Sequence, residues 1–171
     1  MTLSELTKQY KPIEVLGSTE IEISGIELDS RKCKPGSAFV AIRGTQADGH
    51  TYIEKAISLG ASCIICENLP QETNPEVTYA VYNNTADIVG PLATTFYGNP
   101  TKRMKLIGVT GTNGKTTIAT TLYNIIRRIG IKAGLCSTVC NYIDGEAYPT
   151  ECTTPDPITL NQLLGKMADH G

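Results

Sequence analysis

The sequence has no tryptophan, two phenylalanines, two histidines and no long run of basic or apolar residues. Its apolar segments, such as ASCII at 61–65, are far too short to cross a bilayer, and the polar start MTLSELTKQYKP lacks the apolar centre of a signal peptide. Because 15 Lys and Arg face 17 Asp and Glu, the net charge of −2 predicts no nucleic-acid surface. These absences favour a cytoplasmic protein, and 171 residues suffice for one domain and part of another.

The cysteines do not form a convincing metal site. Cys63 and Cys66 have the C-x-x-C spacing of some zinc and redox sites. They lie in the apolar run ASCIICE, which predicts a buried strand, and residues three apart on a strand point to opposite faces. The chain has no second such pair to complete a four-ligand site. We therefore expect reduced thiols at all six positions: Cys33, Cys63, Cys66, Cys136, Cys140 and Cys152.

The first hundred residues alternate between predicted strands and helices. Strands are expected in EISGIELDSRK, ending near Asp29, and in SAFVAIRG, ASCIICE and VTYAVYN. Helices are expected in HTYIEKAISLG and in NTADIVGPLATTFYG, where Asn84 or Thr85 caps the start and Pro91 predicts a kink or an early break. NPTKRM then reads as a linker, so the predicted domains are 1–102 and 103–171.

The second half begins with a strand in KLIGVT, a GTNG loop and a helix over 115–130. A strand in KAGLCST and a hairpin around Asp144-Gly145 follow. A final helix, led in by Asp156 and Pro157, has one apolar face. No strand follows that helix, so the second domain is expected to be incomplete. The predicted fold is α/β: an N-terminal α/β substrate domain, then the first part of a P-loop-type, parallel-sheet ATPase domain.

The segment LIGVTGTNGKTT predicts a phosphate-binding loop. A glycine-rich turn between a strand and a helix directs backbone N–H groups toward an anion, and Lys115 adds a positive charge. Thr116 is placed to bind Mg²⁺ through its hydroxyl. The first glycine of the usual G-x-x-x-x-G-K-[ST] spacing is replaced by Val109, which points away from common GTPases and kinases.

GTNGKTT after a strand resembles the phosphate loop of the Mur ligases, the ATP-dependent ligases that build the peptide of bacterial peptidoglycan. LDSRKCKPGSAFVAIRG, TQADGHTYIEKAISLGA and ECTTPDPITL resemble segments of the family type that adds the third peptide residue. The resemblance implies that uridine-nucleotide contacts come from Leu28, Ser30, Thr45, Gln46 and Ala47. It also implies that Thr153 and Thr154 bind the muramoyl-peptide part of the substrate. ATP would be held by Gly111, Thr112, Asn113, Gly114, Lys115, Thr116 and Thr117, with Lys115 and Thr116 in catalysis and Thr116 on Mg²⁺.

The same resemblance implies a reaction and its partners. The substrates would be UDP-MurNAc-L-Ala-D-Glu, ATP with Mg²⁺, and a diamino acid, either meso-diaminopimelate or L-lysine. The full-length enzyme would be a cytoplasmic monomer serving cell-wall synthesis, and the 171 residues alone are expected to be inactive. Two alternatives remain open: a dipeptide-adding Mur-type ligase, and a non-catalytic fragment that binds a nucleotide or UDP-sugar.

Several of these residues also have a purely structural interpretation. Asp29 and Ser30 suit a turn after a strand, and Asp48-Gly49 suits an ordinary turn. Thr154 suits a helix lead-in, and His50 suits the start of a helix. Arg31 is either a surface charge or a partner of the diphosphate.

Overall fold

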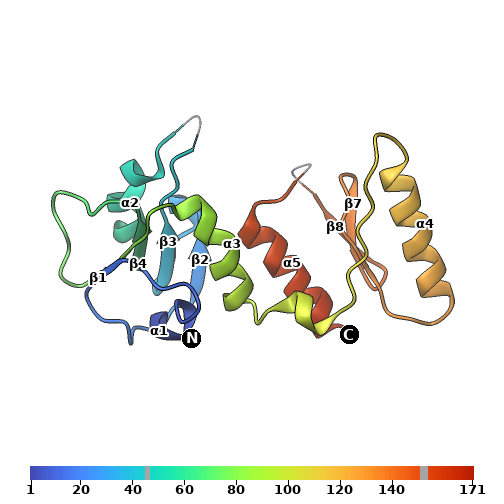
Figure 1. The fold of residues 1–171 in the computed structure, drawn as a ribbon, viewed down its shortest axis with the longest axis horizontal. Coiled ribbons are helices and arrows are strands. Elements are labelled where there is room, and N and C mark those ends of the chain that lie inside the picture. The colour runs from blue at the N-terminus through green and yellow to red at the C-terminus, as the bar shows by residue number, and fades with distance from the viewer. Residues whose placement is uncertain (45–46, 151–153) are drawn as a thin grey trace. The chain divides into compact units, whose positions relative to one another are not determined.

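The computed structural model describes residues 1–44, 47–150 and 154–171. The chain forms two compact units, Met1–Phe96 and Tyr97–Gly171 (Figure 1). None of the helices in the described ranges is long and apolar enough to cross a membrane.

Unit 1 contains a five-stranded sheet with the order β1-β5-β4-β3-β2. Its strands are β1 (Glu14–Leu16), β2 (Gly25–Glu27), β3 (Ser37–Val40), β4 (Ala61–Cys66) and β5 (Thr78–Val81). Strands β2 to β5 run parallel and only β1 pairs antiparallel, at the edge. The α/β class and the four strands predicted in this half are confirmed, whereas the short β1 was not predicted.

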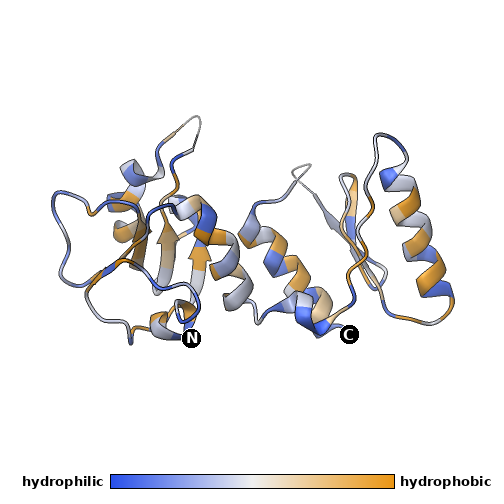
Figure 2. Ribbon diagram, viewed as in Figure 1, coloured by the Kyte–Doolittle hydropathy of each residue, from blue (hydrophilic) through white to orange (hydrophobic). Residues whose placement is uncertain are grey.

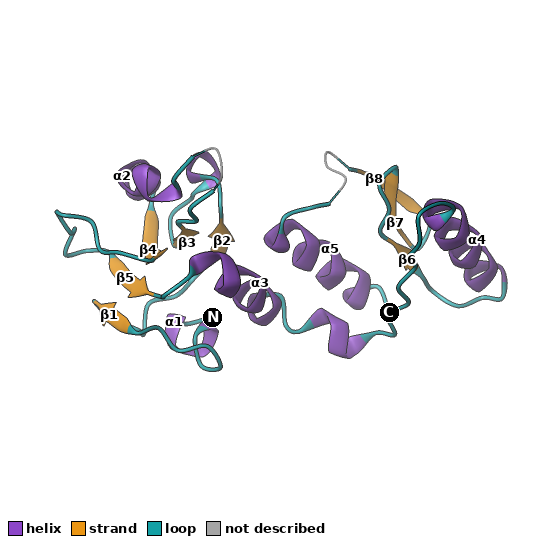
Figure 3. Ribbon diagram, turned by 45° about the horizontal axis from the view of Figure 1, so that its top comes forward, coloured by secondary structure: helices purple, strands orange, loops and turns teal. Residues whose placement is uncertain are grey.

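The helices of unit 1 cover both faces of this sheet (Figures 1 and 3). They are α1 (Leu3–Leu6), α2 (Ile53–Ser58) and α3 (Thr85–Phe96), with the 3₁₀ turns η1 (Ser30–Lys32) and η2 (Gly49–Tyr52). Ile53 and Ala56 of α2 share a core cluster with Phe39, Ile64 and Tyr79, all at most 3% exposed. Burial of the inner strands β3 and β4 on both faces explains why their sequences are nearly continuous apolar runs rather than alternating ones.

The helix α3 continues through Pro91, so the predicted early break is wrong. The residue before a proline is restricted by its own Cβ, and Gly90 has none. Asn84 is the residue that caps this helix, since its Oδ1 accepts hydrogen bonds from the amides of Ala86 and Asp87 at 2.9 and 3.4 Å.

Unit 2 contains a three-stranded antiparallel sheet between two helices (Figures 1 and 3). Its elements are η3 (Pro100–Arg103), α4 (Lys115–Arg128), β6 (Gly134–Leu135), β7 (Cys140–Ile143), β8 (Glu146–Pro149) and α5 (Pro157–Asp169). The predicted hairpin is confirmed: Asp144 and Gly145 both have positive φ, 44° and 101°, as a two-residue hairpin turn requires. The capped start of α5 is also confirmed, because Asp156 Oδ1 accepts from the amides of Ile158 and Thr159.

The strand predicted in KLIGVT is not formed. A parallel strand is held by ladder hydrogen bonds to its neighbours, and no described strand pairs with this segment. Leu106 and Ile107 are consequently 60% and 63% exposed. The strand predicted in KAGLCST is reduced to β6, which pairs antiparallel with β7.

Part of the apolar face of α4 is also exposed. Ile118 and Ile125 are 57% and 52% exposed. Figure 2 shows that apolar and polar stretches alternate along α4. Tyr123 is buried instead, with its ring centroid 5.7 Å from that of Tyr142 on β7. Unit 2 thus packs α4 on the hairpin through this aromatic pair and through the contacts of Arg127 with Asp144, and it leaves Ile118 and Ile125 exposed.

Candidate functional site

The carboxyl ends of β2 to β5 gather the polar residues of unit 1. Because these strands are parallel, the segments that follow them meet at one edge of the sheet, where open α/β sheets bind ligands. Leu28 and Ser30 follow β2, Arg43 and Ala47 follow β3, and Glu67 follows β4. Thr45 and Gln46 lie outside the described residues, as does Thr153 in unit 2.

The turn after β2 is fixed by Asp29. Its Oδ1 accepts the Arg31 amide at 3.0 Å, which caps η1, and its two carboxylate oxygens bind the Arg31 guanidinium at 2.7 to 3.1 Å. Ser30 is 5% exposed and Leu28 is half-buried. The turn interpretation of Asp29 is therefore confirmed, and Arg31 pairs within the turn.

The hydrogen bonds from Arg31, side chain first and then backbone, lower the pKa of Asp29 from 3.8 to about 2. A lowered carboxyl pKa means that the pair stabilises the fold at pH above about 3.8 and that this contribution is lost as the pH falls through about 2. In Arg31→Ala, the Asp29 pKa is expected to rise toward 3.8, as measured by carboxyl ¹³C NMR titration. Arg103→Ala, which removes the partner of Asp169, is the control and should leave the Asp29 titration unchanged. An unshifted Asp29 midpoint in Arg31→Ala would contradict this account.

The loop after β3 is closed at its base. Arg43 and Asp48 form an antiparallel bridge, the Gly49 amide donates to the Ile42 carbonyl at 2.8 Å, and the Gly44 amide donates to the Ala47 carbonyl at 3.0 Å. A Cβ added to Gly49 would lie 2.7 Å from the Ile42 backbone, so this close approach requires glycine. Ala47, on the far side of this base, is exposed, so a ligand can reach it.

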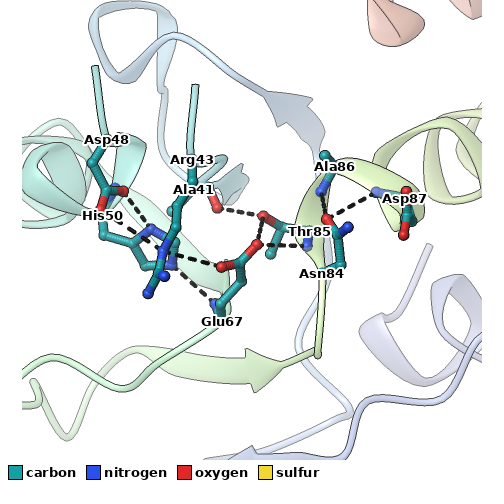
Figure 4. Close-up of polar contacts among 9 residues, drawn as sticks. All are labelled: Ala41, Arg43, Asp48, His50, Glu67, Asn84, Thr85, Ala86 and Asp87. Atoms are coloured by element: carbon teal, nitrogen blue, oxygen red, sulfur yellow. Dashed lines mark hydrogen bonds and ion pairs between the residues drawn. The ribbon is translucent and has the colours of Figure 1, made fainter. Parts of the chain in front are cut away.

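A polar cluster joins this loop to the ends of β4 and β5 (Figure 4). His50 contacts Asp48 through Nδ1 at 2.7 Å and accepts the Glu67 amide through Nε2 at 2.9 Å. The Glu67 carboxylate contacts Arg43 Nε at 3.1 Å and accepts the Thr85 amide at 3.2 Å. His50 does lie at a helix start, in η2, as predicted, but the sequence analysis missed the cluster. The available signal was the position of Glu67 and Thr85 just after two buried strands.

The predicted phosphate loop is exposed and opens directly into α4. Gly111 and Gly114 have φ of 146° and 77°, and the first hydrogen bond of the helix runs from the Ile118 amide to the Gly114 carbonyl. The amides of residues 115–117 therefore precede the helical ladder. Lys115 Nζ donates to the Gly111 carbonyl at 2.6 Å and to the Thr112 carbonyl at 3.3 Å, which places its charge over the loop.

The residues around this loop differ in exposure. Thr112, Asn113 and Thr117 are exposed, and Thr116 is half-buried. Thr154 is exposed, two residues before the Asp156 cap of α5. A convergent set of amides, one lysine and a hydroxyl at a helix start suits a phosphate chain with a divalent cation.

Comparison with known proteins identifies the family. A model described as "Mur ligase family, catalytic domain" matches residues 22–94, and one described as "Mur ligase middle domain" matches 109–171. The chain belongs to the Mur ligase family. The resemblance seen in the sequence is thereby confirmed.

Two relatives have the same enzyme name. A protein of Phocaeicola vulgatus is 61% identical over 171 residues and one of Bacillus licheniformis is 37% identical over 172. Both are named UDP-N-acetylmuramoyl-L-alanyl-D-glutamate--2,6-diaminopimelate ligase. Each alignment covers 100% of this Mur ligase chain but 35% of the relative, so the chain spans about a third of the length of these relatives.

Solved structures agree on the fold. A structure titled as UDP-N-acetylmuramoyl-L-alanyl-D-glutamate--2,6-diaminopimelate ligase matches with a TM-score of 0.74 at 25% identity, over 100% of this chain and 34% of that one. A structure titled as UDP-N-acetylmuramoylalanyl-D-glutamyl-2,6-diaminopimelate--D-alanyl-D-alanyl ligase from Acinetobacter baumannii matches with a TM-score of 0.63 at 22% identity, over 96% of this chain and 33% of that one. The second likeness bears on the fold alone.

Proposed function

We propose that the whole protein is an ATP-dependent amide-bond ligase that adds 2,6-diaminopimelate to UDP-MurNAc-L-Ala-D-Glu in peptidoglycan synthesis. The observation that carries the proposal is identity of 57 to 61% over all 171 residues with three relatives of that name. The reaction is proposed to take place in the cytoplasm, with the enzyme as a monomer. The 171-residue chain by itself is proposed to bind substrates without joining them.

The UDP portion of the substrate is assigned to the domain 1–102. Leu28 and Ser30 lie after β2 and Ala47 after β3, at the sheet edge where such folds bind ligands. Thr45 and Gln46 are assigned to the same pocket by sequence alone. Thr153 and Thr154 are assigned to the muramoyl-peptide part, next to the start of α5.

ATP and Mg²⁺ are assigned to the loop 111–117 in the domain 103–171. The residues fit a nucleotide: the amides of 115–117 are outside the helical ladder, Gly114 places no side chain at the start of the helix, and Lys115 lies over the loop. Thr116 would hold Mg²⁺ through its hydroxyl, and the bound cation would neutralise charge on the phosphates.

In this reaction ATP supplies the γ-phosphoryl group that converts the D-Glu carboxylate into an acyl phosphate, and the amine then displaces phosphate to form the amide. The chain contributes charge and position. Lys115 and the loop amides stabilise negative charge that develops on the transferred group, which is the main form of catalysis in phosphoryl transfer. No side-chain nucleophile is required.

A dipeptide-adding Mur-type ligase is the second candidate, because a structure of that type shares the fold over 96% of this chain. The high identity to diaminopimelate-adding relatives favours the first. Turnover of the full-length protein with diaminopimelate and with D-Ala-D-Ala, each on its own UDP-muramoyl acceptor, separates the two.

Binding of UDP-MurNAc-L-Ala-D-Glu to the 171-residue chain tests the substrate assignment. The unaltered chain is expected to bind saturably in a calorimetric titration, and Ser30→Ala to bind about tenfold more weakly, the ~1.4 kcal/mol of one good hydrogen bond. Ser58→Ala on α2 is the matched control, since Ser58 bonds only the Lys55 carbonyl of its own helix and is expected to change nothing. Equal affinity of the Ser30 and Ser58 variants would remove Ser30 from the site.

A further inference from the structure

His50 in η2 and Glu67 directly after β4 hold the two sides of the base of the candidate ligand loop after β3. The loop base consists of the described residues Arg43 and Gly44 on one side and Ala47 and Asp48 on the other. Arg43 is held by the Glu67 carboxylate, and Asp48 is held by His50, whose ring reaches the Glu67 amide. We call His50 and Glu67 together the bracket (Figure 4).

The hydrogen bonds of His50 define its tautomer. A backbone N–H only donates, so Nε2, which receives the Glu67 amide at 2.9 Å, bears no hydrogen. The ring hydrogen then sits on Nδ1 and is donated to Asp48 Oδ1 at 2.7 Å. The His50 side chain is 14% exposed, so solvent competes little for these contacts. His50 thus connects the far side of the loop base to the end of β4.

The Glu67 side chain holds the near side of the loop base. Its Oε2 lies 3.1 Å from Arg43 Nε, and its Oε1 accepts the Thr85 amide at 3.2 Å and lies 3.3 Å from the Thr85 hydroxyl oxygen. The Thr85 hydroxyl is also 2.7 Å from the Ala41 carbonyl, which directly follows β3. The Glu67 side chain is 15% exposed, and its carboxylate links the segments after β3, β4 and β5.

We propose that His50 and Glu67 are positioning residues for substrate binding, acting through the loop base rather than by touching the ligand. Holding the described ends of a ligand-binding loop in place before the ligand arrives removes part of the ordering cost of binding. This inference rests on the proposed binding of the UDP-muramoyl substrate at this edge. The new element is that the affinity for the substrate depends on the hydrogen bond from the Glu67 amide to His50 Nε2.

The test uses the 171-residue chain with UDP-MurNAc-L-Ala-D-Glu as the probe. His50→Ala is expected to weaken binding at least ~10-fold, while His50→Gln, whose Oε1 can accept the Glu67 amide, is expected to recover most of the loss. The only other histidine, His170, contacts the Lys166 carbonyl at the end of α5, so His170→Ala is the matched control and is expected to bind normally. All titrations are run well below the thermal midpoint of each variant.

Amide hydrogen exchange provides a readout that does not depend on the ligand. In His50→Ala, the amides of Glu67 and Gly49 are expected to exchange faster while the β4 amides stay protected. Faster exchange with unchanged affinity would overturn the positioning role, and unchanged exchange would overturn the bracket itself. If the unaltered chain fails to bind the probe, the proposed substrate site is wrong, and exchange still decides whether the bracket holds the loop.

Discussion

Lys115→Ala is expected to lower ATP turnover by the full-length ligase at least ~100-fold, or ~2.7 kcal/mol in the barrier. The reason is positional: Lys115 Nζ lies over the phosphate loop, within 2.6 Å of the Gly111 carbonyl, where transferred phosphate would gather negative charge. The fold should survive, because the side chain is exposed and its two partners are carbonyls of its own loop. Phosphate release under saturating substrates measures the effect, and circular dichroism checks the fold.

Lys105→Ala is the control for charge, since Lys105 is an exposed lysine ten residues earlier in the chain. It is expected to leave turnover within about twofold of the unaltered enzyme. A loss below about tenfold in Lys115→Ala, ~1.4 kcal/mol, would remove Lys115 from the catalytic assignment.

Ile64→Ala is expected to destabilise unit 1 by about 2–5 kcal/mol, the usual cost of truncating a fully buried isoleucine. Ile64 is 0% exposed at the centre of the sheet, between β3 and β5. Native-state hydrogen exchange of the 171-residue chain should show slow exchange in β3 to β5 and a ~30-fold or larger acceleration there in the variant. Residues 106–113, which form no ladder, should exchange fast in both proteins.

Ile13→Ala makes the same chemical deletion at a side chain that is 63% exposed in the same unit. It is expected to leave exchange in β3 to β5 unchanged, because little apolar surface returns to water. Equal acceleration by the two variants, or equal protection of 106–110 and β4, would contradict the contrast between the packed sheet and the unpaired segment.

Strands β2 to β5 of unit 1 were predictable because each lies in a short segment rich in apolar residues and bounded by turn residues, and each has a parallel neighbour within the same hundred residues. ASCIICE became β4 for this reason. The start of α5 was predictable for a similar reason, because Asp156 and Pro157 act only on the helix that they begin. Such signals are complete within a few residues, so no tertiary information is required.

The failures share a dependence on distant partners. KLIGVT has the composition of a strand, but composition does not show whether a neighbouring strand is available to pair with it. Pro91 in α3 is the exception, because the residue directly before it, Gly90, has no Cβ to clash with the proline ring, and that signal was local. His50 contacts Glu67, which is 17 residues away in the sequence. This contact forms only when the ends of the parallel strands meet, so the spacing within QADGH does not predict it. The candidate ATP loop, by contrast, is contiguous and was read from sequence alone.

The start of α4 differs from that of the other long helices. Asn84 and Asp156 cap α3 and α5 with side-chain oxygens, whereas Gly114 gives α4 no such cap. Compared with a Ser or Asp cap, glycine at this position costs a helix roughly a few tenths of a kcal/mol. A bound phosphate would satisfy the same amides, so nucleotide binding and the melting of α4 are thermodynamically linked. Because Gly114 has a φ of 77°, a Ser installed there would be strained and would not cap the helix. Heat resistance at the start of α4 is therefore expected to come from added nucleotide and not from a substitution at 114.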